Sequence, residues 1–134
     1  MTDSEKWALW TLGVVALTTA AYFIFVALRG HGPAAMSVFA LTALAAVPKG
    51  GHRSWRCLDE RERGIMYKAL LAGYWVMCLA AAALIVIISW IRGWDMTLAL
   101  PVWKLCEAVW WFGLLMLAVR CVATLVLYRR GSNG

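Results

Sequence analysis

The feature that most constrains this chain is a set of long apolar segments separated by short polar ones. The segments cover about residues 7–28, 33–48, 66–91 and 98–128. A helix needs roughly 20 apolar residues to cross the hydrocarbon core of a bilayer, and the first, third and fourth segments are long enough. Strands of a membrane barrel would instead alternate in polarity over about 10 residues. The continuous runs therefore predict an all-α fold, an integral membrane four-helix bundle.

Composition excludes most soluble folds. Of the 134 residues, 63% are hydrophobic and 15% are charged, whereas soluble domains are about 45–50% apolar and about 25% charged. A chain this short cannot bury so much apolar surface in one water-soluble core. We expect a single transmembrane domain over residues 1–134.

The second apolar segment is the short one. Only 14 residues lie between Pro33 and Pro48, and as an α-helix they would extend about 21 Å. Such a segment either crosses the bilayer with help from its flanking residues or turns back as a re-entrant loop. Length alone leaves both alternatives open.

Lysine and arginine decide between them, because they collect on the cytoplasmic side of membrane proteins. Four spans with the N-terminus inside place nine of these residues inside and three outside. The inner set is Lys6, Lys49, Arg53, Arg56, Arg61, Arg63, Lys68, Arg129 and Arg130, and the outer set is Arg29, Arg92 and Lys104. A re-entrant second segment would move the basic residues of 49–68 outside. We therefore predict a multi-pass protein of the cell inner membrane with cytoplasmic N- and C-termini.

The basic cytoplasmic loop, about residues 49–65, leads into the third span. Asp59 and Glu62 are spaced like a helix N-cap and its partner three residues on, so the helix is predicted to begin at about Glu60. Five basic side chains are candidates for binding a partner or lipid: Arg53, Arg56, Arg61, Arg63 and Lys68. The loop is either a solvated helix start or a docking surface for a cytosolic partner or anionic lipid headgroups. We expect no nucleic acid as a partner, because the basic patch lies against the membrane.

A family resemblance rests on the same stretch, which reads D-E-R-E-R-G-I-M-Y-K-A from Asp59 to Ala69. It resembles a segment in small, uncharacterised prokaryotic membrane proteins of about four helices. There, an acidic-Arg-acidic run leads through an Ile and a Lys-Ala pair into the third helix. The matching residues are Asp59, Glu60, Arg61, Glu62, Ile65, Lys68 and Ala69. The resemblance implies an accessory or regulatory protein, with no established enzymatic activity and no catalytic residue to carry over.

Ionisable side chains inside the fourth span are the main candidates for intramembrane chemistry. Such groups cost of the order of 2.5–3.5 kcal/mol at the bilayer centre on insertion scales, so each one suggests a functional site. Glu107 is either neutralised by Lys104, three residues earlier on the same helical face, or faces the bundle and binds a proton or cation. In the second case three residues at a comparable depth in the first span could supply hydrogen bonds: Thr18, Thr19 and Tyr22.

Arg120 is the other charged group in this span. It lies about 20 Å from Glu107 along the helix axis, so the two are not expected to pair. We expect Arg120 to extend to the inner headgroups or to contact another helix, at the depth of residues 72–74. Small residues at spacing four, Ala16 with Ala20 and Ala69 with Gly73, predict close helix packing.

No metal or cofactor site is expected. The four cysteines form no C-x-x-C pair and no zinc-like set with histidine. His31 and His52 flank the second span on opposite sides of the membrane, so they cannot bind one haem together. The sequence carries no catalytic motif, so we expect no enzyme.

The sequence as a whole favours a non-enzymatic accessory or regulatory membrane protein that acts through helix packing and its basic cytoplasmic loop. The alternative is a small oligomeric transporter or channel, coupled to protons or cations, that uses Glu107. Expected partners are the lipid bilayer, anionic headgroups, a cytosolic or membrane protein, and a second copy of the chain.

Overall fold

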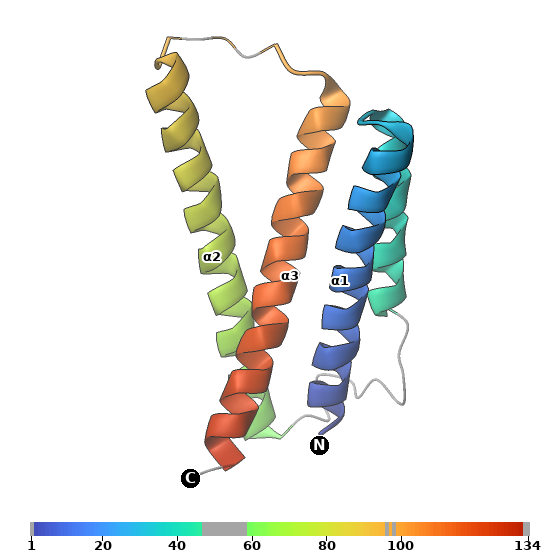
Figure 1. Cartoon of the computed structure of the whole chain (residues 1–134). Helices are drawn as coiled ribbons and strands as arrows, with labels where there is room; N and C mark the ends of the chain where they lie inside the picture. Colours follow the sequence, from blue (N-terminus) through green and yellow to red (C-terminus); the bar gives the residue numbers. More distant parts are fainter. Residues whose placement is uncertain (1, 47–58, 96, 98, 133–134) are drawn as a thin grey trace.

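The computed structural model describes residues 2–46, 59–95, 97 and 99–132. The described residues form four helices and no strand (Figure 1): α1 (Asp3–Arg29), η1 (Pro33–Ala46), α2 (Glu60–Arg92) and α3 (Val102–Ser132). Three of them, α1, α2 and α3, are long and apolar enough to cross a membrane. The prediction of an all-α, multi-pass membrane protein is confirmed to this extent.

Sequence signals at the helix ends explain where α1 and α2 begin. Thr2 and Glu5 bond reciprocally at the start of α1, where the Thr2 side chain accepts from the Glu5 N–H and the Glu5 carboxylate accepts from the Thr2 N–H at 2.7 Å. Asp59 caps α2, as expected, and its carboxylate accepts from the Glu60 N–H at 2.8 Å. The bond goes to the first helical N–H, whereas the expected capping box would use the third.

Glycines end α1 and α2. Gly30 and Gly93 have φ of +81° and +85°, a left-handed conformation that glycine adopts without a Cβ penalty. The backbone N–H groups of both residues still donate to the preceding turn, at 2.9 Å to Val26 and Ser89. α3 begins at Val102, four residues later than the expected start at 98, directly after Pro101.

The short second segment is wound as a 3-10 helix. Its hydroxyls donate to the carbonyl three residues back, Ser37 to Ala34 at 2.7 Å and Thr42 to Phe39 at 2.6 Å. At about 2.0 Å per residue, 14 residues extend about 28 Å, compared with about 21 Å for an α-helix. As a 3-10 helix, the segment is therefore about 7 Å longer than the α-helix that was expected from its residue count. The expected end at residue 48 lies outside the described residues.

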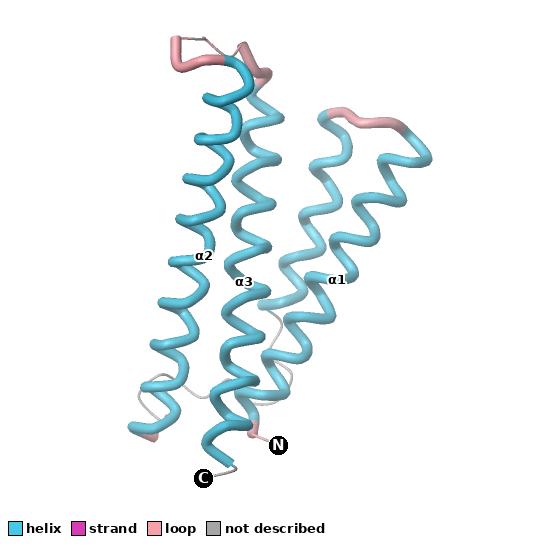
Figure 2. The backbone as a smooth tube through the Cα atoms, turned by 60° about the vertical axis from the view of Figure 1, so that its left-hand side comes forward, coloured by secondary structure: helices cyan, strands magenta, loops and turns pink. Residues whose placement is uncertain are grey.

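The four helices form two hairpins (Figure 2), α1 with η1 and α2 with α3. η1 runs back beside α1. Near the C-terminal end of η1, the Trp10 indole N–H of α1 donates to the Leu44 carbonyl at 3.0 Å. α3 contacts both members of the other hairpin. A buried apolar cluster forms where α1, η1 and α3 meet: Tyr22, Ala35, Phe39 and Leu114.

α2 packs on α3 only near one end and leans away toward the end where the two are joined (Figure 1). At the contact, a Cβ on Gly73 would lie 2.8 Å from the Met116 carbonyl oxygen, and Ala69 is fully buried. The predicted close packing at Ala69 and Gly73 is confirmed. The prediction for Ala16 and Ala20 is wrong because both are exposed. The buried face of α1 carries Ala8, Thr11, Val14, Thr18 and Tyr22 instead.

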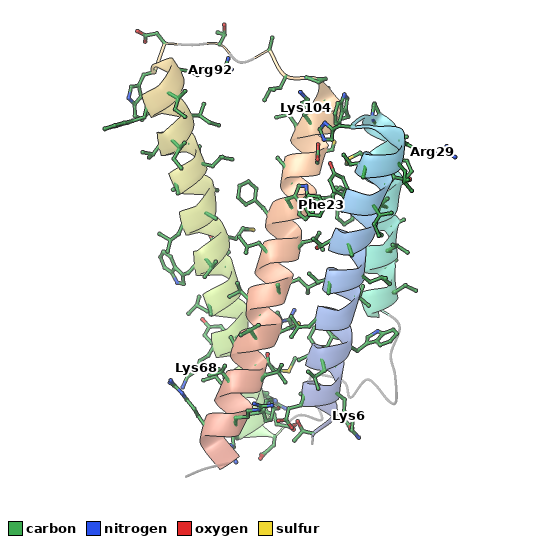
Figure 3. The ribbon with its side chains drawn as sticks, in the orientation of Figure 1. Lys6, Phe23, Arg29, Lys68, Arg92 and Lys104 are labelled. Atoms are coloured by element: carbon green, nitrogen blue, oxygen red, sulfur yellow. The ribbon has the colours of Figure 1, made fainter. Side chains whose placement is uncertain are left out.

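Charged residues separate between the two ends of the structure. The N- and C-termini lie at one end (Figure 1), which Lys6 and Lys68 also occupy, whereas Arg29, Arg92 and Lys104 lie at the other (Figure 3). These five residues thus separate as the two predicted charge sets do, while Lys49, Arg53 and Arg56 lie outside the described residues.

Candidate functional site

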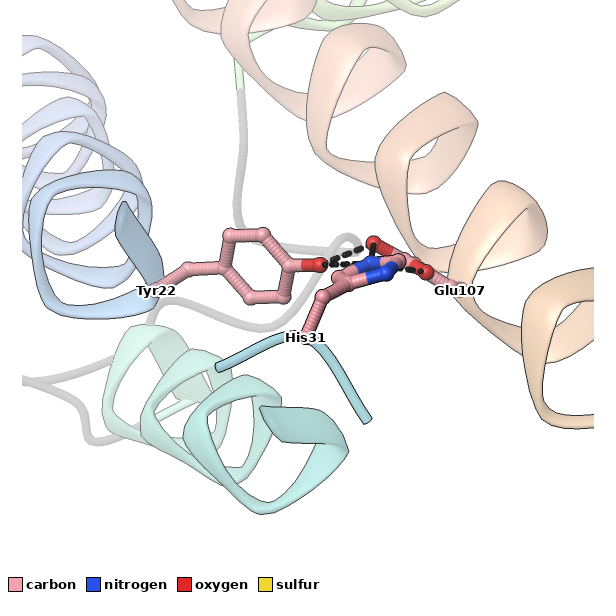
Figure 4. Close-up of polar contacts among 3 residues, drawn as sticks. All are labelled: Tyr22, His31 and Glu107. Carbon is pink, nitrogen blue, oxygen red and sulfur yellow. Dashed lines mark hydrogen bonds and ion pairs between the residues drawn. The ribbon is translucent and has the colours of Figure 1, made fainter. Parts of the chain in front are cut away.

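Three polar side chains from separate parts of the chain meet near the end of the structure that carries Lys104 (Figure 4). Tyr22 comes from α1, His31 from the loop between α1 and η1, and Glu107 from α3. The Tyr22 hydroxyl donates to the Glu107 Oε1. His31 Nε2 lies 3.0 Å from the Tyr22 hydroxyl and 3.1 Å from each carboxylate oxygen. We refer to these residues as the Tyr22–His31–Glu107 cluster.

Local structure explains how each member reaches the cluster. Tyr22 is the last residue of the buried face of α1. Glu107 comes five residues after the start of α3 at Val102, about 7.5 Å along the helix axis. The positive φ of Gly30 turns the chain as α1 ends, so that His31 folds back over Tyr22.

The three members differ in exposure, so the cluster extends from the surface of the protein into its interior. The side chain of His31 is 46% exposed and that of Glu107 is 13% exposed, while Tyr22 is 5% exposed. The imidazole thus lies between the outside of the protein and the carboxylate, and the phenol lies beneath.

Aromatic rings hold the buried part of the cluster. The Tyr22 ring stacks on Phe39 at a centroid distance of 5.3 Å and meets Trp111 edge-on at 5.1 Å. Phe39 is buried in the core, so it fixes the phenol against η1. Edge-to-face and offset contacts of this kind stabilise by about 0.5–1.5 kcal/mol beyond the area they bury. The Tyr22 hydroxyl is therefore presented to Glu107 by a rigid surround.

The outer part of the cluster rests on Trp103. The imidazole of His31 packs against this indole at a centroid distance of 5.0 Å. The Lys104 ammonium lies over the same ring at 5.7 Å. The lysine thus makes a cation–π contact near the cluster, and the ion pair of Glu107 in the described residues is with His31.

The geometry shows which way the Glu107 side chain faces, while the binding of a proton or cation there stays a prediction. The carboxylate faces α1 and the α1–η1 loop, and the predicted hydrogen bond from Tyr22 is confirmed. The expectation that Lys104 neutralises Glu107 is not met, because the lysine turns to Trp103. Thr18 and Thr19, at a similar depth, donate to carbonyls of their own helix.

Protein-family models, curated proteins and solved structures were compared with the chain, and none matched. The resemblance of residues 59–69 to small prokaryotic membrane proteins therefore stays a prediction. The functional assignment rests on the chemistry of the Tyr22–His31–Glu107 cluster itself.

Sequence reasoning missed His31. It considered the two histidines only as joint ligands of a haem, and His52 lies outside the described residues. A signal was present in the sequence: His31 stands between Gly30 and Gly32, in a loop predicted on the same membrane side as Glu107. A loop at the level of an intramembrane carboxylate can bring its histidine to that carboxylate.

Arg120 was expected either at the inner headgroups or in contact with another helix, and the structure shows the contact with another helix. Its guanidinium lies over the Trp7 ring of α1 at 5.3 Å. Its Cβ would be 3.5 Å from a Cβ on Gly73, so the predicted depth beside residues 72–74 is confirmed. Arg120 lies 13 residues beyond Glu107 on α3, about 20 Å along the axis, and the two form no ion pair among the described residues.

The basic candidates lie apart from the cluster, at the end with the termini. Arg61, Arg63 and Lys68 are exposed in the first turns of α2, while Arg53 and Arg56 lie outside the described residues. The Arg61 guanidinium lies against the backbone of Gly131 in the last turn of α3, where the helix dipole favours a cation.

Three of the four cysteines lie in the described part of the chain. Cys78, Cys106 and Cys121 are free, with Cys121 buried and Cys106 exposed, and Cys57 lies outside the described residues. In the part of the chain that the structure describes, no group of three or more His, Cys, Asp or Glu side chains could hold a metal ion. The expectation that the protein carries no cofactor stays a prediction.

Proposed function

We propose that the protein is a small multi-pass transporter or channel that binds a proton or a cation at Glu107. One observation carries the proposal: a largely buried carboxylate in a membrane-crossing helix is bonded to two side chains that can exchange protons, Tyr22 and His31. Ionisable groups at such positions are costly and mark ion and proton pathways in membrane proteins.

The order of exposure supports a route through the cluster. His31 is open to the outside, Glu107 is nearly enclosed, and Tyr22 is buried. The ring nitrogens of an imidazole can donate and accept protons, and His31 Nε2 lies 3.1 Å from both carboxylate oxygens, so the imidazole can pass a proton between water and the carboxylate. The cluster then works as the outer station of a transport path.

Charge distribution supports the orientation. The end with the termini carries Lys6, Lys68 and the basic start of α2. Under the positive-inside rule this end faces the cytoplasm, and the cluster faces the opposite side of a prokaryotic inner membrane. We propose an oligomer as the working unit, because a second copy of the chain could cover the exposed apolar side chains on the half of α2 that leans away from α3.

Reconstitution of the full chain in liposomes tests this function. Wild-type protein should give proton flux, followed by an internal pH-sensitive dye, when a cation gradient is applied. Glu107→Gln should abolish the flux while leaving the helix content and elution volume unchanged. Asp95→Asn is the matched control, because Asp95 is an exposed carboxylate in the turn that follows α2, at the end of the structure that also carries Lys104. Absence of wild-type flux with every cation tried would refute the proposal.

A second candidate function is that of a non-enzymatic accessory or regulatory protein. It is supported by the exposed side chains of Arg61 and Lys68 at the end with the termini, which can meet a cytosolic partner or anionic headgroups. A photo-crosslinker placed at Arg61 in cells should capture one defined protein. Recovery of lipids or of the chain itself alone would count against this candidate.

A further inference from the structure

We infer that the Tyr22–His31–Glu107 cluster is a binding site for a flat aromatic nitrogen cation, and that His31 is a tethered occupant which this ligand displaces. The inference rests on the proposed function, since it assigns a substrate class to the same carboxylate. It starts from the contacts that the imidazole of His31 makes.

The His31 ring is held as a bound ligand would be held. Its Nε2 lies 3.1 Å from both oxygens of Glu107 and 3.0 Å from the Tyr22 hydroxyl. The imidazole and the Trp103 indole meet edge to face, with their ring centroids 5.0 Å apart. A protonated imidazole is a flat aromatic cation with N–H donors. The residues around it therefore already recognise the shape and the charge of such a group.

The surroundings suit an organic cation better than a small inorganic one. Calcium takes six to eight oxygen ligands and magnesium takes six in near-octahedral geometry, whereas the described cluster offers one carboxylate and one phenol oxygen. Aromatic rings make up much of the rest of the surround. The Lys104 ammonium already lies over the Trp103 face, which is the contact that binds organic cations to aromatic rings.

His31 is the member of the cluster that can leave without moving a helix. It lies on a loop between Gly30 and Gly32, and nothing lies within 4 Å of a Cβ placed on either glycine. Its side chain is about half exposed. Tyr22, by contrast, is packed between Phe39 and Trp111, and Glu107 is part of α3. Swinging the loop outward would uncover the carboxylate and the part of Trp103 that His31 contacts.

Binding of N-methylacridinium to the purified full chain tests the inference, with quenching of the dye by tryptophan as the readout. Because His31 competes for the same carboxylate, His31→Ala should bind the dye about tenfold more tightly than wild type, the factor that corresponds to releasing one hydrogen-bonded contact. His31→Gln, which keeps an uncharged polar side chain on the loop, should also bind more tightly. Glu107→Gln should weaken binding at least tenfold, and Asp95→Asn should leave it unchanged.

Neutral acridine, measured at a pH where it carries no charge, is the matched probe and should bind equally weakly to all variants. An affinity gain in the His31 variants for the cation but not for neutral acridine is the deciding result, because misfolding would raise the binding of both dyes. Equal or weaker binding in both His31 variants would overturn the inference, and so would equal binding of the cation and neutral acridine. Dye binding without proton flux would refute the proposed transport but not this site. Proton flux without an effect of His31 on dye binding would refute this site but not the proposed transport.

Discussion

Replacing Gly73 with alanine tests whether α2 and α3 pack as closely as the structure places them. The new Cβ would lie 2.8 Å from the Met116 carbonyl oxygen and 3.4 Å from the Met116 Cγ. Since the first neighbour is backbone, no side-chain rotation relieves the contact. Ordinary van der Waals contact begins at 3.4 Å, so the two helices must separate by several tenths of an ångström.

The expected cost follows from two opposing terms. Overpacking of a tight contact costs about 1–3 kcal/mol, while alanine gains up to about 1 kcal/mol over glycine in a helix interior. We expect Gly73→Ala to lower the free energy of unfolding by about 1–2 kcal/mol. Gly113→Ala is the control, because nothing lies within 4 Å of a Cβ at that position on α3, and it should be neutral or stabilising.

Unfolding by sodium dodecyl sulfate in mixed micelles, followed by circular dichroism, measures both variants on the same scale. The two should differ by about 2 kcal/mol, which corresponds to a factor of about 30 in the unfolding equilibrium. If Gly73→Ala is as stable as Gly113→Ala, the α2–α3 contact does not have the described geometry.

Three further substitutions test other contacts. Tyr22→Phe removes the hydroxyl that bonds Glu107 and should lower the free energy of unfolding by about 1–2 kcal/mol; an unchanged value would mean that the bond adds nothing to stability. Arg120→Gln removes the cation–π contact with Trp7 and should cost about 0.5–1 kcal/mol in the same assay, against no change if Arg120 meets headgroups instead. Trp10→Phe removes the indole N–H that bonds the Leu44 carbonyl, so amides near the end of η1 should exchange hydrogen faster, and unchanged exchange would contradict the role of this bond.

Sequence reasoning predicted the features that depend on local chemistry. The apolar runs located the membrane helices, and Asp59 marked the start of α2 because a carboxylate satisfies free N–H groups there. Counting residues along antiparallel helices placed Tyr22 level with Glu107 and Arg120 level with Gly73. These estimates need only the helical rise.

The features that sequence reasoning missed depend on tertiary structure. Residue spacing identified Ala16 and Ala20 as a possible contact, but it does not say which face of α1 meets a neighbour. His31 reaches Glu107 only because Gly30 adopts a positive φ, which the loop sequence permits but does not require. The 3-10 winding of η1 likewise depends on contacts with α1, since apolar residues of this kind form α-helices equally well.

The winding of η1 has a consequence for the membrane in which the chain resides. Rewound as an α-helix, the same 14 residues would shorten by about 7 Å and Leu44 could no longer reach the Trp10 indole. Where η1 crosses the bilayer, its winding would set the thickness that the α1–η1 hairpin spans, and mismatch of a few ångströms has an energetic cost that sorts proteins between membranes. Lipids with longer or shorter acyl chains should thus favour one winding over the other. Through the loop that carries His31, bilayer thickness would then be coupled to the position of the imidazole over Glu107.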